Sequence, residues 1–410
     1  MIVKWKKKKD GSITDITNVV GTVSWEGSTT QAARTATITV LNAPNDPNIQ
    51  KLKLNLAVGD IIALYEDGKN IFYGEIQTSE KTSEKGQISY TANDLMSHML
   101  RISHKGKFKN KTPEAIAKEL CKKYGISTTS IAKTKKSIGK LIIDENNLYN
   151  IVMMAYTKAA KSNGKKYMAF MESSKFGVKE RGKLVENFTI SDQTNITNST
   201  YEESIENLVD QVRIYNEKGK QVGVVKNADH IKRYGVFQEI YTKEKGVNAK
   251  TAAKNMLVGI EKKVNVEVIN ANINCVAGAA VKVHDAATNL DAKFWIDSDS
   301  HTWENGQHKM SLELNFKNIM DSQESDDNGT KKTKKGSGTN KSLAGNYIVK
   351  STSTVMREKA GRSSKMVEKL KKGEKVKCTG KYTYVGGTAW YQATAKGKTG
   401  YIYSPNLKKG

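Results

Sequence analysis

The sequence predicts a mainly β protein that carries a small α+β insert. Three features of the chain support this class. Apolar and polar residues alternate towards the end of residues 294–316, the period of a half-buried strand. Short strand-like runs bounded by turn residues recur in residues 1–100 and 184–320. Helix-capping signals gather in residues 101–183. We therefore expect two β-rich regions separated by a compact mixed domain.

The hairpin predicted in residues 294–316 organises the chain. Its turn is Glu304-Asn305-Gly306, and Asn-Gly is a strong hairpin signal. The return strand is expected to bury Met310, Leu312, Leu314 and Phe316, and to expose Lys309, Ser311, Glu313 and Asn315. Two strands alone are marginal in water. We therefore expect further strands that complete a barrel or a sandwich.

Residues 1–100 contain several short strands. Runs at residues 61–65 and 71–73 flank the polar turn of residues 66–70, which indicates a hairpin. Four consecutive lysines occupy positions 6–9. We interpret them as a solvated strand end or hairpin tip, and an anion site is the weaker alternative.

Residues 101–183 have the signals of helices. Thr112 and Pro113 fit an N-cap and a first helical position, and a second helix is expected after a cap near Asn147. The first helix is expected to bury Ile116, Ala117, Leu120, Cys121 and Tyr124 on one face and to end at Gly125. Residues 167–171 and 176–178 predict a small hairpin. Since Cys121 lies on the apolar stripe, we expect a buried, unreactive thiol rather than a nucleophile.

Residues 184–320 return to strands. Runs at 211–215 and 221–225 flank a Glu-Lys-Gly turn and predict another hairpin. A helix is expected after a cap at Asn248, with an apolar stripe formed by Ala252, Ala253, Met256, Leu257 and Ile260. Residues 264–268 then alternate as a strand.

Residues 321–345 contain almost nothing that can be buried, and we predict a flexible linker there. Residues 346–410 predict a separate small β domain with glycine-containing turns. The expected domains are therefore residues 1–100, 101–183, 184–320 and 346–410.

The formal net charge of +25 is placed unevenly. Residues 1–100 hold 11 basic and 11 acidic residues, and residues 184–340 hold 20 and 22. Residues 101–183 hold 20 basic and 6 acidic residues, and residues 341–410 hold 16 and 3. A nucleic-acid binder is expected to spread basic residues along one continuous face. We therefore expect a modular protein without a specific nucleic-acid site. The basic insert either carries a solvated face or faces an acidic partner.

The sequence shows no apolar run long enough to span a membrane and no secretory signal. Cys121, Cys275 and Cys378 are few, odd in number and far apart. They predict neither a disulfide framework nor a zinc site, and synthesis in a reducing cytoplasm is the simpler interpretation.

Motifs of common enzymes are missing from the sequence. There is no helical His-Glu zinc motif, no glycine-rich phosphate loop and no serine elbow. His301 and His308 flank the hairpin turn, and we prefer ordinary polar residues there to a metal pair. A pair of glycosidase carboxylates stays open because any two carboxylates can converge in a fold. We predict a protein that is not an enzyme, with no catalytic, cofactor-binding or metal-binding residues.

Residues 204–316 resemble the baseplate hub protein of contractile phage tails, the XkdQ/YqbQ group in prophages of Gram-positive bacteria. The resemblance is carried by residues 204–208 leading into 211–215, by Lys232-Arg233-Tyr234-Gly235, and above all by residues 294–316. The N-terminal region and the basic insert are similar to that family in order and size.

This resemblance implies two tube-like β-barrel domains in each chain and three chains in a ring. Three copies of two barrels then mimic six subunits, so that a homotrimer adapts a sixfold tail tube to a threefold central spike. It also implies other baseplate proteins as partners and surfaces, rather than a catalytic site, as the functional parts.

Residues 346–410 resemble a bacterial SH3-like cell-wall-binding domain. The matching parts are residues 369–376, Trp390-Tyr391 and residues 397–402, whereas residues 355–360 lack the usual Arg-Ser/Ala-Gly-Pro turn. The resemblance implies binding to peptidoglycan or teichoic acid. The candidate wall-binding residues are Tyr382, Tyr384, Trp390 and Tyr403. For Trp390 and Tyr401 we prefer the alternative that they lie in the core and do not bind the wall.

We therefore expect a structural hub of a phage tail or a phage-tail-like bacteriocin, made in the host cytoplasm and released by lysis. The alternatives are a tail-associated peptidoglycan hydrolase or cell-wall lytic protein, and a wall-anchored surface protein. The missing secretory signal weakens the last of these.

Overall fold

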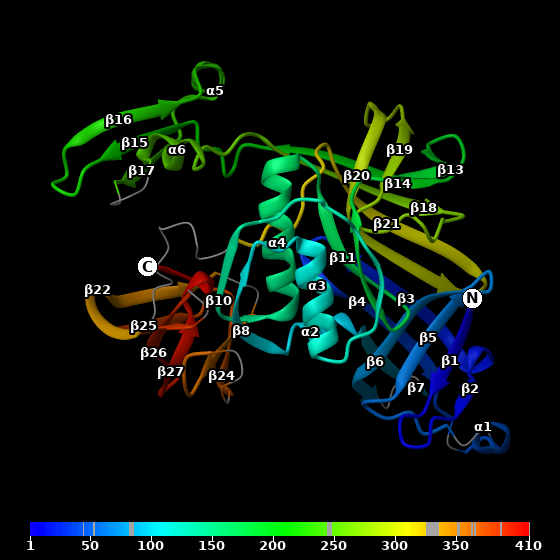
Figure 1. The fold of residues 1–410 in the computed structure, drawn as a ribbon. Helices are drawn as coiled ribbons and strands as arrows, with labels where there is room; N and C mark the ends of the chain where they lie inside the picture. The colour runs from blue at the N-terminus through cyan, green and yellow to red at the C-terminus, as the bar shows by residue number, and fades with distance from the viewer. Residues whose placement is uncertain are drawn as a thin grey trace. The chain divides into compact units, whose positions relative to one another are not determined.

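The computed structural model describes residues 1–43, 45–51, 54–81, 86–243, 248–324, 336–350, 353–361, 364, 366–385 and 388–409. The chain divides into two compact units, Met1–Asp327 and Asn328–Gly410. Both are built mainly from strands (Figure 1), which confirms the predicted mainly β class. Within the described residues, no helix is sufficiently long and apolar to cross a lipid bilayer.

A thirteen-stranded sheet dominates the first unit. Its N-terminal strands are β1 (Ile2–Lys6), β2 (Ile13–Asp15), β3 (Val20–Ser28), β4 (Gln31–Leu41), β5 (Ile61–Glu66), β6 (Lys69–Lys81) and β7 (Gln87–Asp94). Its later strands are β13 (Leu184–Ser191), β14 (Ile196–Ser204), β18 (Glu261–Ile269), β19 (Ala280–Asp285), β20 (Leu290–Glu304) and β21 (Gln307–Asn315). The order is β14-β18-β21-β20-β3-β4-β7-β6-β5-β1-β2, and β19 pairs with both β20 and β13. The short helices η1 (Thr17–Val19), α1 (Pro47–Lys51) and α2 (Met96–Met99) lie in the connections.

Strand β20 joins an N-terminal lobe (β1–β7) to a C-terminal lobe (β13, β14 and β18–β21). Its first part, residues 290–295, pairs with β19, and its second part, residues 298–304, pairs with residues 22–28 of β3. Each lobe has its own apolar core. The two regions predicted as barrels are therefore parts of one sheet. Pairing between the described strands forms an open path, so closure into barrels stays a prediction.

The hairpin β20–β21 has the predicted turn and almost the predicted faces. Asn305 and Gly306 both have positive φ angles, 51° and 75°, as a two-residue type I′ turn requires. Met310, Leu312 and Leu314 are at most 3% exposed. The prediction for Phe316 was wrong, because this residue follows the end of β21 and is 39% exposed. Its ring instead packs edge-on against Phe294 at the border of the core.

A second, three-stranded sheet is inserted between β14 and β18 (Figure 1). It comprises β15 (Gln211–Tyr215), β16 (Gln221–Lys226) and β17 (Gln238–Thr242), with helices α5 (Ala228–Tyr234) and α6 (Ala249–Lys254). The predicted hairpin is β15–β16, and the predicted cap, Asn248, accepts a hydrogen bond from the Thr251 amide. The helix ends earlier than predicted, because Val258 already pairs as an extended bridge with Val209.

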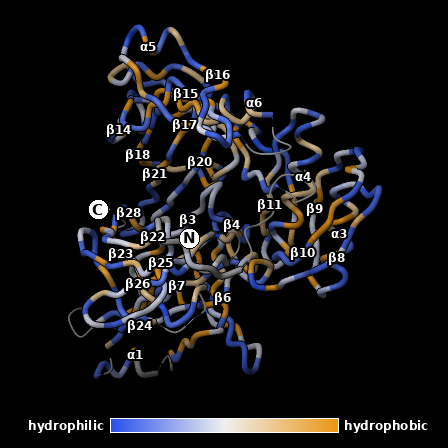
Figure 2. The backbone as a smooth tube through the Cα atoms, turned by 90° about the vertical axis from the view of Figure 1, so that its left-hand side faces the viewer, coloured by the Kyte–Doolittle hydropathy of each residue, from blue (hydrophilic) through white to orange (hydrophobic). Residues whose placement is uncertain are grey.

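The insert contains β8 (Ser103–Lys109), α3 (Pro113–Lys123), β9 (Thr128–Ile131), β10 (Lys140–Asn147), α4 (Leu148–Asn163), β11 (Tyr167–Glu172) and β12 (Lys175–Glu180). Both predicted caps are present: Thr112 accepts from the Ala115 amide and Asn147 from the Asn150 amide. The apolar faces of α3 and α4 meet in one core, and Figure 2 shows orange stretches gathered in these helices and in β9 and β10. The α+β character predicted here is thus confirmed.

The start of the predicted linker is fixed to helix α4. Tyr149 donates a hydrogen bond to Asp321 (2.8 Å), the Gln323 amide donates to Thr157 (3.1 Å), and Lys161 pairs with Glu324 (2.6 Å). At the other end, strand β22 already begins at Gly336. The predicted linker of residues 321–345 is therefore too long at both ends, and its residues 325–335 lie outside the described part. Polar residues can dock through hydrogen bonds, which a hydropathy pattern does not reveal.

The second unit forms a seven-stranded sheet in the order β24-β23-β27-β26-β25-β22-β28. The strands are β22 (Gly336–Val349), β23 (Ser353–Arg357), β24 (Met366–Lys371), β25 (Lys375–Val385), β26 (Thr388–Ala395), β27 (Lys398–Tyr403) and β28 (Leu407–Lys409), with the 3-10 helix η2 (Ser404–Asn406). Its core includes Val349, Met356, Leu370, Ala393 and Ile402, each fully or almost fully buried.

Candidate functional surfaces and the polar junction

A buried ion pair ties the two lobes together. Arg34 on β4 donates from both terminal nitrogens to the two carboxylate oxygens of Asp299 on β20. The Asp299 side chain is completely buried and also accepts from the Ala277 amide at 2.6 Å. The Arg34 guanidinium lies 4.0 Å from the centre of the Trp25 ring on β3. Such a bidentate, hydrogen-bonded pair fixes geometry because removal of either partner leaves a buried charge unpaired.

His301 and His308 meet at this junction. His301 Nδ1 lies 3.0 Å from His308 Nε2, and His301 Nε2 lies 3.1 Å from the Cys275 carbonyl oxygen. Since the carbonyl can only accept, His301 donates from Nε2 and accepts from His308 at Nδ1. Burial lowers the pKa of His301, and burial together with His301 lowers the pKa of His308 to about 4.

The two histidines that flank the turn thus meet through a hydrogen bond. Both ring nitrogens of His301 are occupied in it. The described residues contain no cluster of three or more His, Cys, Asp or Glu side chains arranged for a metal. His301 is also fully buried, unlike the turn-proximal polar residue that we expected. The pair therefore belongs to the packing between the lobes.

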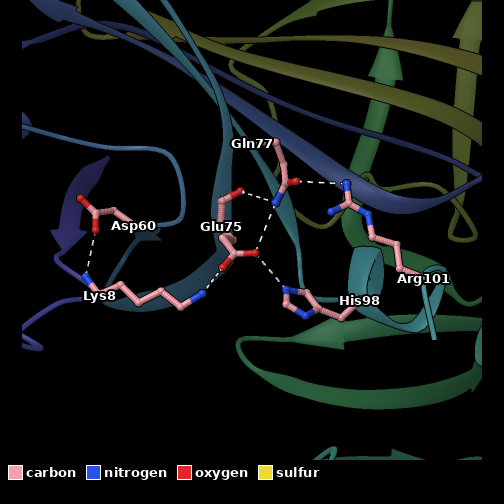
Figure 3. A network of polar contacts seen from close by, with 6 residues as sticks. All are labelled: Lys8, Asp60, Glu75, Gln77, His98 and Arg101. Carbon is pink, nitrogen blue, oxygen red and sulfur yellow. Dashed lines mark hydrogen bonds and ion pairs between the residues drawn. The ribbon is translucent and has the colours of Figure 1, made fainter. Parts of the chain in front are cut away.

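A second polar network joins Lys8, Glu75, Gln77, His98 and Arg101 in the first unit (Figure 3). Glu75 on β6 pairs with Lys8 and, at 3.0 Å, with His98 on α2, while Arg101 donates to Gln77 at 3.1 Å. Burial alone would raise the pKa of Glu75, but the hydrogen bonds from Lys8 and His98 bring it below its usual value. Lys8 lies in the turn after β1 and its side chain is 62% exposed, as expected of a solvated hairpin tip, and it also pairs with Glu75.

The insert exposes lysines on strand β8. Lys105, Lys107 and Lys109 alternate with less exposed residues. Lys105 pairs with Asp144, but Lys109 lies directly opposite Lys140 of β10 in the strand register. Like charges placed opposite each other in a sheet are unfavourable. Both interpretations of this basic surface, a solvated face and a face for an acidic partner, fit these positions.

The three cysteines are buried and free. Burial raises the pKa of the Cys121 and Cys378 thiols to about 11 and that of Cys275, also near Asp299, to about 12. Neutral, buried thiols are poor nucleophiles. The predicted burial of Cys121 is confirmed.

Three of the four candidate wall-binding residues have described side chains, and they lie on two faces of the second unit's sheet. Trp390 pairs in register with Tyr403, and their rings meet edge-on at 5.5 Å. Tyr382 pairs with Tyr391, which packs against the core. Tyr382 and Tyr403 are half-buried, and the side chain of Tyr384 lies outside the described part. Trp390 and Tyr403 therefore share one face, and Tyr382 lies on the other.

The prediction that Trp390 and Tyr401 lie in the core was only partly correct. Trp390 is 4% exposed but stands on the face opposite the core residue Ile402. Tyr401 is half-buried and pairs with Gln392 and Arg357, so it lies outside the core. In a two-faced sheet the neighbours 401 and 402 point in opposite directions, and Ile402 takes the core position.

Known proteins similar to this chain agree with the two-unit division. Residues 23–315 match the family model described as YQBQ-like, and residues 352–408 match the bacterial SH3 domain. Two relatives from Bacillus subtilis (strain 168), the phage-like element PBSX protein XkdQ and the uncharacterized protein YqbQ, are each 24% identical over 311 residues. Each alignment covers 74% of this chain and 94% of the relative.

Solved structures share the fold of the first unit. The prophage MuSo2 43 kDa tail protein from Shewanella oneidensis matches with a TM-score of 0.57 and 13% identity, covering 77% of this chain and 95% of that one. The tail protein from Neisseria meningitidis MC58 matches with a TM-score of 0.53 and 16% identity, covering 76% and 95%. These matches confirm the resemblance that the sequence predicted. The chain belongs to the YQBQ-like family and ends in a bacterial SH3 domain.

Proposed function

We propose that this protein is a structural baseplate hub of a contractile tail, of either a phage or a phage-tail-like bacteriocin. The observation that carries the proposal is strand β20, which joins two β lobes into one sheet inside the family-matched region. Such a chain presents two β lobes held in one sheet. The tail proteins that share the fold, and the PBSX protein that shares the sequence family, support a place in a tail.

In this proposal three copies form a ring between the tail tube and the central spike, next to other baseplate proteins. Two lobes in each of three chains supply six positions around a threefold axis, and closed rings are the common outcome of such contacts. The particle is assembled in the host cytoplasm and is released by lysis. Light scattering at high protein concentration, with and without the spike, tests the ring. A monomer under both conditions would count heavily against it.

The second unit is proposed to bind the Gram-positive cell wall. The bacterial SH3 match and the 16 basic against 3 acidic residues in 341–410 support this role. Charge attraction between exposed groups fades beyond a screening length of about 8 Å in physiological salt, whereas aromatic stacking persists. A pull-down of the full chain on peptidoglycan, with and without teichoic acid and across a salt series, separates the two contributions.

Each outcome of that pull-down has a meaning. Retention at high salt supports aromatic recognition, and its loss in Tyr403→Ala but not in Tyr382→Ala, on the opposite face, assigns it to the Trp390–Tyr403 face. If binding is lost once teichoic acid is removed from the peptidoglycan, the unit binds only through its basic surface. No binding at any salt concentration would remove wall binding and leave a domain that docks on another tail protein.

The hub is proposed to act through its surfaces, without catalysis. The competing function is a tail-associated peptidoglycan hydrolase. A zymogram on cell-wall substrate distinguishes them, because a hydrolase produces a cleared band and a hub does not.

A further inference from the structure

An open cavity of about 650 Å³ lies in the first unit, between the insert and both lobes. Its walls come from β3 and β4, from β11 and β12, and from residues 273–279. Segments far apart in the sequence thus build one concave site. Pockets for small ligands have volumes of about 300–1,000 Å³. The cavity plays no part in the proposed hub contacts, and it raises the question of what it can hold.

One wall of the cavity carries a positive charge. Lys179 on β12 is a lining residue whose ammonium lies 5.2 Å from the centre of the Phe170 ring. Among the residues that the structure describes, Lys179 takes part in no ion pair, whereas Lys165 and Arg181 nearby pair with Glu180 and Asp297. Burial, with Arg34 close by, lowers the pKa of Lys179. A partly buried ammonium without a carboxylate partner is favourable only when an anion or water reaches it.

The neighbouring wall includes two residues with buried N–H groups. Arg34 and Trp25 both line the cavity, and Arg34 Nε and Trp25 Nε1 are buried atoms without an acceptor among the described residues. Arg34 is held in place by Asp299, so its position does not depend on a ligand. Asp94 also lines the cavity, and its burial raises its pKa to about 7. Below that pH its carboxyl group is mostly neutral and repels an anion little.

The remaining lining is mixed. Its apolar part includes Met168, Ala169, Val276 and Ala277, and it also contains the carboxylates Glu172, Glu180 and Glu186. Glu180 pairs with Lys165 and Glu186 with Lys183, which offsets their negative charge. Sites for organic ligands combine apolar walls with a few placed polar groups. The positive charge of Lys179 favours a negatively charged ligand, and the apolar wall favours an apolar group on that ligand.

We propose that this cavity binds a carboxylate attached to an apolar group, with the carboxylate at Lys179 and the apolar part against Met168 and Val276. A free organic acid and an acidic residue of a peptide segment share this chemistry. The proposal does not depend on trimer formation or on wall binding, so either can fail without affecting it.

The test uses the full chain with ¹⁵N-labelled tryptophan and three probes. These are acetyl-Leu-Asp-amide, its neutral isostere acetyl-Leu-Asn-amide, and free 4-methylpentanoate. The indole signal that disappears in Trp25→Phe identifies Trp25. We expect acetyl-Leu-Asp-amide to shift this signal and the Asn analogue to leave it unchanged. A response to 4-methylpentanoate alone identifies a free acid as the ligand, and a response to the dipeptide alone identifies a peptide segment.

Substitutions at Lys179 assign the charge. Lys179→Met should weaken binding about tenfold or more, which corresponds to about 1.4 kcal/mol, and Lys179→Arg should retain it. Lys4→Met is the matched control, because Lys4 is also half-buried over an aromatic ring, Tyr65, but lies outside the cavity. No shift with any probe up to about 10 mM, well above a Kd of 1 mM, would overturn the proposal. Equal responses to the Asp and Asn dipeptides, or equal binding by Lys179→Met, would do the same.

Discussion

Charged side chains are paired in the buried interior at the lobe junction, whereas in the second unit they are paired at the surface. At the junction, Asp299 and His301 are completely buried, and they bond to Arg34 of β4 and to the Cys275 carbonyl oxygen respectively. In the second unit, Glu368 pairs with Lys396 and Lys398, whose side chains are about half exposed. A buried pair leaves a strongly unfavourable charge when broken, whereas water replaces the partner of an exposed one.

This difference indicates which polar contacts specify the architecture. The buried network can form only when β4, β20 and the stretch around Cys275 are all in register. It therefore selects the arrangement of the two lobes. The exposed pairs of the second unit tolerate many arrangements and contribute mainly to solubility and charge.

The largest expected effect comes from the apolar face beside the junction. Leu312→Asp places an unpaired carboxylate at a fully buried position of β21, which costs several kcal/mol, roughly the whole margin of a domain. Glu313→Lys changes the adjacent exposed position and should be mild. Calorimetry of the full chain measures both. Equal melting temperatures of the two variants would show that the register is wrong.

A smaller but still large effect is expected when the buried ion pair is broken. Arg34→Met leaves Asp299 buried without its cation, and we expect about 3–5 kcal/mol of destabilisation. Arg34→Met with Asp299→Asn should recover part of this loss, because the buried charge is removed as well. Denaturant titration of both single variants and of the double variant measures the coupling free energy. Strictly additive losses would contradict a direct interaction.

The histidine pair predicts a pH dependence confined to the first unit. The pKa of His308 is lowered to about 4 in the folded protein against an ordinary value of 6.5. The unfolded chain therefore binds more protons between these values, so the stabilising contribution is full above pH 6.5 and is lost as the pH falls towards 4. The loss is at most about 3 kcal/mol.

His308→Gln isolates this contribution, because Asp94, with its raised pKa, shifts the same window in the opposite direction. The stability difference between wild type and variant should shrink as the pH falls from 6.5 to 4. A difference that is constant across this range would exclude titration of His308 as its cause.

The smallest effect is expected at the surface of the second unit. Glu368→Gln removes the partner of two exposed lysines, and we expect no resolvable change in the melting of that unit. Thermal melts at low and high salt provide the measurement. A fall in melting temperature as large as that caused by Arg34→Met would show that exposed and buried ion pairs stabilise the two regions equally.

Local features were predictable where one segment contains all of the necessary information. The Asn305-Gly306 turn, the caps Thr112, Asn147 and Asn248, and the burial of Leu312 each depend on neighbours in the sequence. The ends of elements were less predictable. Helix α6 stops at Lys254 because of a bridge to Val209, and residues 321–324 dock on α4 through hydrogen bonds. Both depend on residues distant in the chain.

The junction shows most clearly why the remaining features could not be predicted. Before a bulge between Ile296 and Ser298, the even positions Phe294 and Ile296 of β20 point inward. After it, the odd positions Asp299, His301 and Trp303 do. A bulge reverses the alternation, and no pattern of hydropathy marks its position. The burial of Asp299 and His301 therefore could not be predicted from the pattern of the strand.

The sequence by itself determined the class of each region, because periodicity and capping are local. It also determined the family resemblance and the uneven charge. Only the tertiary structure decided that the two β regions share one sheet through β20 and β3, and that Arg34 meets Asp299 across 265 positions of chain. The physical reason is that burial of a charge is favourable only when a distant partner arrives in the right geometry, and this depends on the whole fold.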